Sequence, residues 1–381
     1  MTGEAEDRPG RRVSRRWLLR AAGSGVAALS LGAGSGLRPR PAAAFERTVR
    51  WVSPRGNIEV LDDYPYWVAK KFGYFGDIAT TLEPGPMEAA ACVRLVDQDQ
   101  SDLGYPSPGV FSTGLGQGMK LVSVWQMGAT DLFDFAFRKG EAPGSLRDLQ
   151  GKTIALASIE WKTISDPMFA QAGIEPASIK YAEAGPGWGQ ALAQGQADAA
   201  LSWEGLRAQW RGQGLDFDYL LGRDISRFPA NSFVMRRADF EDASRTSLYE
   251  SYLRAWAMGL EFGHQNPRAA THIVMTQFPG LQLKPDIATE SMMELASVFR
   301  GDFAKRQGWG WHDLDSWRLF LKTVRDIGQI TVDLKAEDVI KNDFVAAANR
   351  LDAARVKADA DAYELPDDYK AVDVEAIHVR L

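Results

Sequence analysis

From Thr48 onward, short runs of apolar residues alternate with longer stretches in which apolar residues recur at helical spacing. Strands that alternate with helices in this way predict an α/β fold with largely parallel sheets. Asp62 and Asp63 supply an N-terminal cap ahead of Pro65, and the helix that follows should end at Gly73. The apolar runs predict strands at 48–53, 79–82, 102–105, 121–126, 132–138, 153–157, 179–182, 197–203 and 232–236. Further helices are expected at 87–97 and 107–117. A helix should also include residues 167–172, another should include Gln190, and a third should follow the strand at 197–203 and end near residue 212.

The pattern changes after about residue 239 and stays almost wholly helical as far as residue 354. Within this tail, four apolar residues at spacings of four, three and four predict one buried helix face. These residues are Tyr249, Leu253, Trp256 and Leu260. Residues 357–381 are acidic and poor in apolar side chains, so we expect this last stretch to lie as a strap over the surface.

Composition narrows the class of protein. The 381 residues are 45% hydrophobic and 25% charged, with a formal net charge of −6, which fits a globular chain and argues against a nucleic-acid partner. This length allows two or three domains. A single cysteine, Cys92, excludes an internal disulfide and any multi-cysteine metal site. The four histidines lie in the last third of the chain, so we expect no metal site and no cofactor. They are His264, His272, His312 and His378.

Positive charge is concentrated at the start of the chain. Residues 1–44 hold eight arginines against three carboxylates, a net charge of +5. Because the whole chain has a net charge of −6, the residues after 44 carry a net charge of −11. The sequence SRRWLLR at 14–20, a weakly apolar run after it and the small residues 42–44 resemble a bacterial twin-arginine export signal. That resemblance implies cleavage near Ala44, the twin-arginine export machinery as a partner and a periplasmic location. The alternative is a basic amphipathic helix on a membrane surface.

Four sequence motifs occur in order along residues 48–240. They are YWVAKKFGYF at 66–75, DLGYPSP at 102–108, LRDLQGKTI at 146–154 and GQADAALSWE at 195–204. Together they resemble the substrate-binding proteins of ABC importers, in the NMT1/THI5-like branch that includes binders of aliphatic sulfonates, nitrate and thiamine pyrimidines. The helical tail resembles that family only in its general character.

The resemblance implies a type II periplasmic-binding-protein fold, in which two α/β lobes enclose a ligand cleft and a helical C-terminal extension follows. We expect lobe 1 to comprise residues 45–136 and 234–356, lobe 2 residues 137–233, and the strap residues 357–381. The chain should cross between the lobes near 135–138 and return near 229–233. The implied function is that of a monomeric solute-binding protein that closes on a small organic ligand and delivers it to an ABC permease.

Residues that follow the predicted strands are candidates for the pocket, because ligands of open α/β sheets bind at the carboxyl ends of strands. Several of these residues are aromatic and suit the stacking of a flat ligand, although each alone is also consistent with core packing. The candidates are Tyr64, Tyr66, Trp125, Trp161, Trp188 and Trp203, with Tyr105 and Phe111 nearby. Ser107, in the turn after the third strand, adds a hydroxyl group to this set.

The polar candidates favour a ligand that donates hydrogen bonds. Sulfonate- and nitrate-binding relatives have a second-lobe turn rich in glycine and serine, whereas the turn at 158–163 is bulky and acidic. Asp62, Glu160 and Glu204 add carboxylates, which favours an aromatic nitrogen heterocycle such as a pyrimidine, or an amine. Asp62 and Glu160 are also consistent with helix capping.

Two basic residues and the fold itself leave alternatives open. Arg55 and Lys162 suit an anionic ligand, namely an aliphatic sulfonate, taurine or nitrate. A periplasmic sensor or an enzyme on the same fold is a further alternative. Motifs for a serine nucleophile elbow, a Walker loop or a zinc protease are absent, and the glycines at 185–189 lack dinucleotide spacing. Yeast-type thiamine pyrimidine synthases, which resemble these binders, use a pocket histidine and a cysteine cluster that this sequence lacks. We therefore expect no enzymatic activity.

Overall fold

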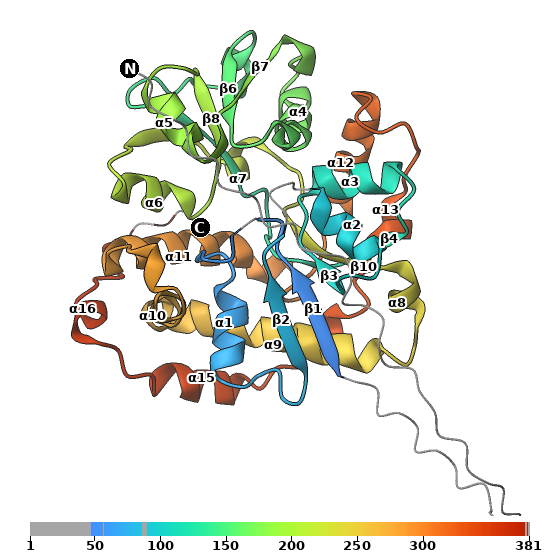
Figure 1. Cartoon of the computed structure of the whole chain (residues 1–381), viewed down its shortest axis with the longest axis vertical. Coiled ribbons are helices and arrows are strands. Elements are labelled where there is room, and N and C mark those ends of the chain that lie inside the picture. Colours follow the sequence, from blue (N-terminus) through green and yellow to red (C-terminus); the bar gives the residue numbers. More distant parts are fainter. Residues whose placement is uncertain (1–46, 56, 86–89, 378, 380–381) are drawn as a thin grey trace, which may run out of the picture. The chain divides into compact units, whose positions relative to one another are not determined.

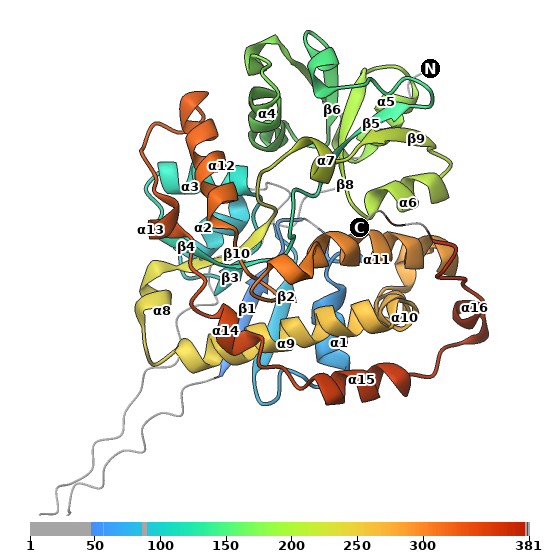
Figure 2. The same ribbon diagram turned by 180° about the vertical axis from the view of Figure 1, so that it is seen from behind.

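The computed structural model describes residues 47–55, 57–85, 90–377 and 379, and within them two five-stranded sheets (Figures 1 and 2). The first sheet has the strand order β2-β1-β3-β10-β4. Its strands are β1 (Thr48–Val52), β2 (Ala79–Glu83), β3 (Leu103–Gly104), β4 (Leu121–Gln126) and β10 (Ser232–Arg236). β1 runs parallel to β2 and β3, with Trp51 opposite Leu82 and Leu103, whereas β10 runs antiparallel to β3 and β4.

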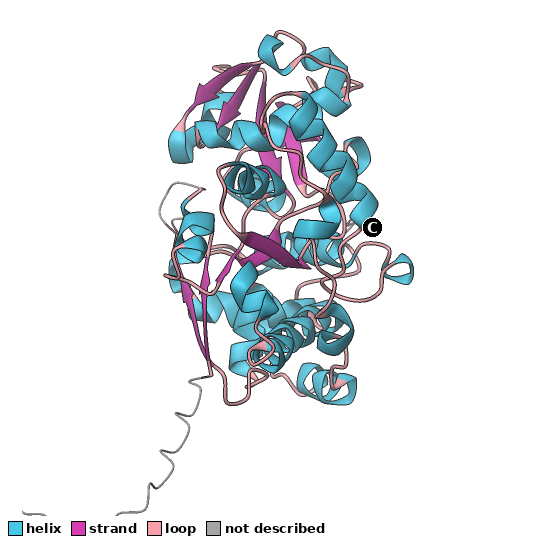
Figure 3. Cartoon of the chain, turned by 90° about the vertical axis from the view of Figure 1, so that its right-hand side faces the viewer, coloured by secondary structure: helices cyan, strands magenta, loops and turns pink. Residues whose placement is uncertain are grey.

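The second sheet has the order β7-β6-β8-β5-β9. Figure 3 draws the strands in magenta and the helices that surround them in cyan. Its strands are β5 (Phe133–Arg138), β6 (Thr153–Leu156), β7 (Lys180–Glu183), β8 (Ala199–Trp203) and β9 (Phe217–Leu220). β6 runs parallel to β7 and β8, whereas β5 runs antiparallel to β8 and β9. The α/β class is confirmed. Both sheets are nevertheless mixed, because the strand that follows each crossing of the chain, β5 or β10, enters its sheet antiparallel to its neighbours.

The chain leaves the first sheet through residues 127–132 and returns to it through residues 221–231. These crossing segments are hydrogen bonded to each other, since the Met127 N–H donates to the Asn231 carbonyl at 3.1 Å. The predicted boundary after residue 136 falls inside β5, and β5 lies wholly in the second sheet. The sequence does not distinguish the two positions, because the alternating pattern of residues 133–138 suits a strand of either sheet. We propose that the lobes exchange the chain at these two segments. Below, the first lobe is residues 47–126 and 232–379, and the second lobe is residues 133–220.

The ends of helix α1 (Tyr64–Lys71) are set partly by the local sequence and partly by a tertiary contact. Pro65 occupies its first turn, and the chain leaves the helix at Phe72 and Gly73, where φ is +64°. Asp63 stands at the N-cap position, yet its carboxylate accepts no hydrogen bond from the helix, because it pairs with Arg55 instead. The predicted capping role of Asp63 is therefore wrong.

Two glycines allow α1 to touch the long tail helix α9 (Thr246–Gln265). A Cβ atom at Gly259 would lie 2.1 Å from the carbonyl oxygen of Pro65, and one at Gly263 would lie 2.2 Å from the ring of Tyr64. Because neither glycine carries a side chain, the helices come into direct contact and Tyr64 is completely buried between them. This contact makes α9 part of the core of the first lobe.

The tail is almost wholly helical, as predicted. Its helices are α8 (Arg237–Glu241), α9, α10 (Pro267–Gln277), α11 (Pro285–Arg300), α12 (Leu314–Asp326), α13 (Ala336–Val339), α14 (Val345–Ala348), α15 (Ala353–Asp361) and α16 (Asp367–Lys370). The predicted face of α9 is buried, and Trp256 within it meets Trp51 of β1 edge-on at 5.2 Å between ring centroids. α16 and much of α15 lie in the predicted strap, where Asp359 accepts a hydrogen bond from Tyr74 at 3.0 Å.

The remaining helices connect the strands. They are α2 (Ala91–Asp97) and α3 (Pro108–Gly116) in the first lobe, α4 (Lys162–Gln171), α5 (Trp188–Ala193) and α6 (Leu206–Gly212) in the second, and α7 (Gly222–Ile225) in the return crossing. β9 and α7 are not predicted from the sequence, because four residues are too few for a period to show. In the described part of the chain, no helix has the length and apolar character needed to span a membrane. The export signal predicted at 1–44 lies outside the described residues.

Candidate functional site

Two contacts join the lobes at the carboxyl ends of strands. The Trp203 side chain, at the end of β8, lies beside the Asp62 carboxylate, just before α1, and lowers the pKa of that carboxyl group slightly. Glu160, in the short helix η2 (Ile159–Trp161) after β6, accepts a hydrogen bond from the backbone N–H of Ala90 at 3.3 Å. Predicted pocket residues of both lobes therefore meet here, and this region is the candidate ligand site.

Three tryptophans of the second lobe form a cluster at this site. Trp188 stacks on Trp203 with ring centroids 5.9 Å apart and an angle of 18° between the rings. Trp161 stands edge-on to both of them, at 5.5 and 5.8 Å. All three are half-buried, and the Trp188 indole N–H is held by the Leu201 carbonyl at 2.8 Å. Partly exposed rings held in this way suit stacking on a flat ligand.

On the first-lobe side, one guanidinium lies among carboxylates. Arg55 Nη2 is 2.7 Å from both carboxylate oxygens of Asp63, and its Nη1 is 3.5 Å from Asp62. Burial raises the pKa of Asp62 to about 6; Arg55 opposes this rise and the charge of Asp63 adds to it. Because two carboxylates already engage Arg55, it is poorly placed to recruit an anionic ligand.

The second basic candidate is also engaged. Lys162 places its Nζ atom 5.2 Å from the centre of the Tyr181 ring, in a cation–π contact. Among the described residues, the charged groups that contact one another or the Ala90 N–H at the site are the guanidinium of Arg55 and the carboxylates of Asp62, Asp63 and Glu160. This balance favours a ligand that carries N–H donors or a positive charge.

The structure places three of the predicted aromatic residues in the core of the first lobe. Tyr64, Tyr66 and Trp125 are completely buried. The Tyr66 hydroxyl donates to the Thr80 carbonyl at 3.3 Å, and the Trp125 ring is covered so closely that a Cβ atom at Gly310 would lie 2.0 Å from it. Their places beside predicted turns mislead, because a turn residue faces the core as readily as a cleft.

Two of the predicted polar residues have structural roles in place of the ligand contacts expected for them. Ser107 caps α3, since its hydroxyl accepts a hydrogen bond from the Val110 N–H at 3.3 Å. Glu204 is completely buried and is bound by Arg207 and by Arg223, the latter at 2.6 Å. Both side chains are therefore satisfied within the protein.

Two groups at the site are not predicted from the sequence, the Asp63 carboxylate and the Ala90 N–H. From its position Asp63 is expected to cap the helix, although the close spacing of Arg55 and the aspartate pair is a signal for an ion pair. The Ala90 N–H leaves no signal, because every residue other than proline carries the same group.

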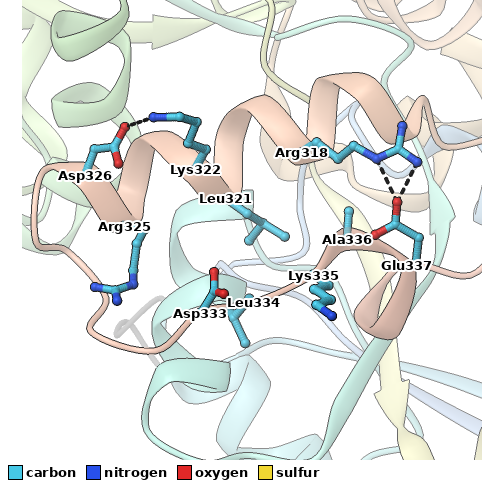
Figure 4. Close-up of a pocket in the computed structure, with 10 residues that line it drawn as sticks. All are labelled: Arg318, Leu321, Lys322, Arg325, Asp326, Asp333, Leu334, Lys335, Ala336 and Glu337. Carbon is cyan, nitrogen blue, oxygen red and sulfur yellow. Dashed lines mark hydrogen bonds and ion pairs between the residues drawn. The ribbon is translucent and has the colours of Figure 1, made fainter.

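Two hollows in the described structure share no residue with this site. A groove of about 710 Å³ lies between α12 and the segment 333–337. Figure 4 shows that its rim carries the ion pairs Arg318–Glu337 and Lys322–Asp326 above apolar side chains. A cavity of about 10 Å³ beside Asp131 has room for a single water molecule.

Lowering the pH from 7.5 to 4.5 is expected to stabilise the wild type by about 2 kcal/mol more than an Asp62→Asn variant. The pKa of Asp62 is about 6 in the folded protein against 3.8 ordinarily, so the folded state binds the proton more tightly than the unfolded chain. This stabilisation is complete below pH 3.8 and is lost as the pH rises through 6. Urea unfolding of both proteins at pH 4.5, 6 and 7.5 measures the difference; parallel pH profiles would contradict it.

Comparison with known proteins gives one family match. The profile of the family described as NMT1/THI5 like matches residues 62–270. This stretch begins at Asp62 and includes Glu160 and all three clustered tryptophans. The match therefore spans both sides of the candidate site.

Individual relatives are more distant. The riboflavin-binding protein RibY of Chloroflexus aurantiacus is 24% identical over 303 residues, which cover 74% of this chain and 82% of the relative. The solved alkanesulfonate-binding protein SsuA of Xanthomonas axonopodis pv. citri, bound to MOPS, has a TM-score of 0.57 at 13% identity, covering 78% of this chain and 98% of that one. The ligand-binding component of an ABC-type import system from Staphylococcus aureus has a TM-score of 0.57 at 11% identity, covering 80% and 99%. At these identities the structural likeness shows a shared fold, that of periplasmic binding proteins.

Proposed function

The chain belongs to the NMT1/THI5-like family, and from this premise we propose that it is an extracytoplasmic solute-binding protein that closes on a small organic ligand and delivers it to an ABC permease. The fold that it shares with the binding component of an ABC-type import system supports this function. A ligand that contacts both lobes would favour the closed state. The proposal includes a twin-arginine signal at 1–44 with cleavage near Ala44, a periplasmic location and a monomeric protein.

We propose that the ligand is a flat aromatic nitrogen heterocycle or an amine. The observation that carries this proposal is the cluster of Trp161, Trp188 and Trp203 beside three carboxylates and one guanidinium. The rings would stack on a flat ligand, and the carboxylates would accept hydrogen bonds from its N–H groups. The name of the riboflavin-binding relative supports a flat nitrogen heterocycle and makes riboflavin the first ligand to test.

An aliphatic sulfonate, taurine or nitrate is the second candidate class. It is favoured by the shared fold of an alkanesulfonate-binding protein and by the presence of Arg55 at the site. The engagement of Arg55 by Asp63 and of Lys162 by Tyr181 counts against it. A periplasmic sensor on the same fold would lack a neighbouring permease and ATPase in its genome, and an enzyme would turn over its bound ligand.

Native mass spectrometry of the protein expressed in the periplasm tests the proposal. A nitrogen heterocycle or amine that is released on denaturation would support the proposed ligand class, whereas a sulfonate would overturn it. If the protein is isolated empty, a thermal-shift titration decides between the classes, because a ligand at 100 times its Kd adds about 2.7 kcal/mol of stability. A shift with an alkanesulfonate and none with riboflavin, pyrimidines or amines would reject the heterocycle.

Glu160→Gln is expected to weaken the binding of an amine or heterocycle at least tenfold and to leave the binding of an alkanesulfonate unchanged or tighter. The substitution removes a negative charge from the site and keeps a side-chain carbonyl oxygen that accepts the Ala90 N–H. Isothermal titration calorimetry measures both affinities. Glu175→Gln, at an exposed position of the second lobe, is the matched control and should change neither. Equal losses for both ligands would reject the role of Glu160 in recognition.

A further inference from the structure

Helices α6 and α11 belong to different lobes and pack against each other (Figure 1). Glycines at both ends of this contact allow a close approach. Gly205 has a φ of +90°, and a Cβ atom there would lie 2.7 Å from Leu295 Cγ. At Gly212, a Cβ atom would lie 2.9 Å from Ile287 Cγ2. We call this contact, made by residues 204–212 and 287–295, the α6–α11 seam.

Side chains of α11 satisfy the backbone of the second lobe at the start of α6. The Gly205 N–H donates to Glu294 Oε2 at 3.0 Å, and the Ser291 hydroxyl donates to the Gly205 carbonyl at 2.7 Å. Gln209 extends the contact by donating to Ser291 Oγ at 2.9 Å. Opening the seam would therefore expose two backbone groups whose partners come from the other lobe.

A buried set of charges closes the seam. Arg207 pairs with Glu204 of its own lobe and, at 3.3 Å, with Glu294 of α11. Arg223 binds the second oxygen of Glu204 at 2.6 Å. Glu204 is completely buried and Glu294 is 6% exposed, so separation of the helices would leave Glu294 or Arg207 without its partner across the seam.

The C-terminal half of α11 touches both crossing segments. The Ala129 N–H, in the outward segment, donates to the Val298 carbonyl at 2.8 Å. Arg223, in the return segment, donates to Ser297 Oγ at 3.2 Å. α11 thus runs from the seam to the two segments about which the lobes would turn.

Some hydrogen bonds that join the lobes away from α11 are weaker than those of the α6–α11 seam. Ala90 to Glu160 and Gln329 to the Thr163 carbonyl are both single hydrogen bonds of 3.3 Å. Glu160 and Thr163 are half-buried, so water replaces these bonds readily when the lobes part.

We propose that α11 is the fixed edge of the cleft. The α6–α11 seam stays closed throughout ligand exchange, and the lobes separate at the contacts of Glu160, Asp62 and Gln329. The significance of this motion rests on the proposed solute-binding function. The motion itself is measured without any ligand, so failure of one proposal is distinguishable from failure of the other.

Amide hydrogen exchange of the wild-type protein, read at single residues, tests the proposal. The Gly205 N–H, bonded across the seam, should have a protection factor about 100-fold higher than that of the Ala90 N–H, which is bonded across the opening edge. A ratio above tenfold supports a closed seam. A ratio below tenfold means that the seam opens together with the cleft and overturns the proposal.

A disulfide across the seam provides the second test. A Cβ atom at Gly212 would lie 3.7 Å from Ile287 Cβ, within the range that a disulfide requires, and Cys92, the native cysteine, is buried. In a Gly212→Cys/Ile287→Cys variant, the Ala90 protection factor should change less than tenfold between the reduced and oxidised forms. A rise of tenfold or more on oxidation would overturn the proposal. If this variant does not fold, the wild-type exchange ratio still decides.

Discussion

Replacing Glu204 with alanine is expected to lower the free energy of unfolding by about 3–5 kcal/mol. Both carboxylate oxygens of Glu204 are bound, one by Arg207 and the other by Arg223 at 2.6 Å, and the side chain is completely buried. Alanine would leave these guanidiniums, whose side chains are 15% and 10% exposed, with one negative charge fewer. Arg207 would keep Glu294 as a partner, but the desolvation of the two guanidiniums would be offset by less attraction.

Urea unfolding at pH 7 measures this loss. Glu337→Ala is the matched control, because Glu337 forms an ion pair with Arg318 in which both side chains are 51% exposed. Its loss should stay below about 1 kcal/mol. Similar losses in the two variants would show that burial adds nothing to the strength of the Glu204 cluster.

Trp203→Ala is expected to weaken ligand binding about 10- to 100-fold, since stacking of a flat heterocycle on an aromatic ring contributes about 1–3 kcal/mol. The ring of Trp203 lies parallel to that of Trp188, and its side chain reaches Asp62 of the other lobe. The substitution therefore removes both a stacking surface and a contact that holds the cleft closed. Quenching of riboflavin fluorescence measures the affinity when riboflavin is the ligand.

Trp203→Phe separates the two contributions. Phenylalanine keeps a stacking ring but has no N–H for Asp62, so its affinity should lie between those of the wild type and the alanine variant. Thermal unfolding confirms that each variant is folded. An alanine variant that is folded and binds as tightly as the wild type would remove Trp203 from the site.

Much of the fold is predictable because each lobe alternates short apolar runs with amphipathic stretches. The bounds of β4 and β10 match the prediction residue for residue. The sequence pattern does not tell which sheet Phe133–Arg138 joins, because its apolar and polar residues alternate in the same way in either sheet. The antiparallel entry of β5 and β10 depends on the path of the chain between sheets, which hydrophobic periodicity does not encode.

The second-lobe side of the candidate site is easier to predict from the sequence than the first-lobe side. Trp161, Trp188 and Trp203 follow strands of the second lobe, as predicted, and lie together in the structure. Tyr64 is also aromatic and also lies beside a predicted turn, but its ring packs against Gly263 in the core. The role of Glu204 depends on Arg223, which lies in α7, beyond one further helix (α6) and one strand (β9) of the chain.

The strand order of the first sheet has a consequence for biosynthesis. β4 pairs with β10, and the whole second lobe lies between these two strands in the sequence. A nascent chain that ends within the second lobe therefore presents β3 and β4 as open edges, which invite pairing with other chains. β4 can pair with β10 only after the whole second lobe has been synthesised, and non-local pairing of this kind is slow. Transport that takes folded cargo, as the signal proposed at 1–44 implies, would give β10 time to arrive before the membrane is crossed.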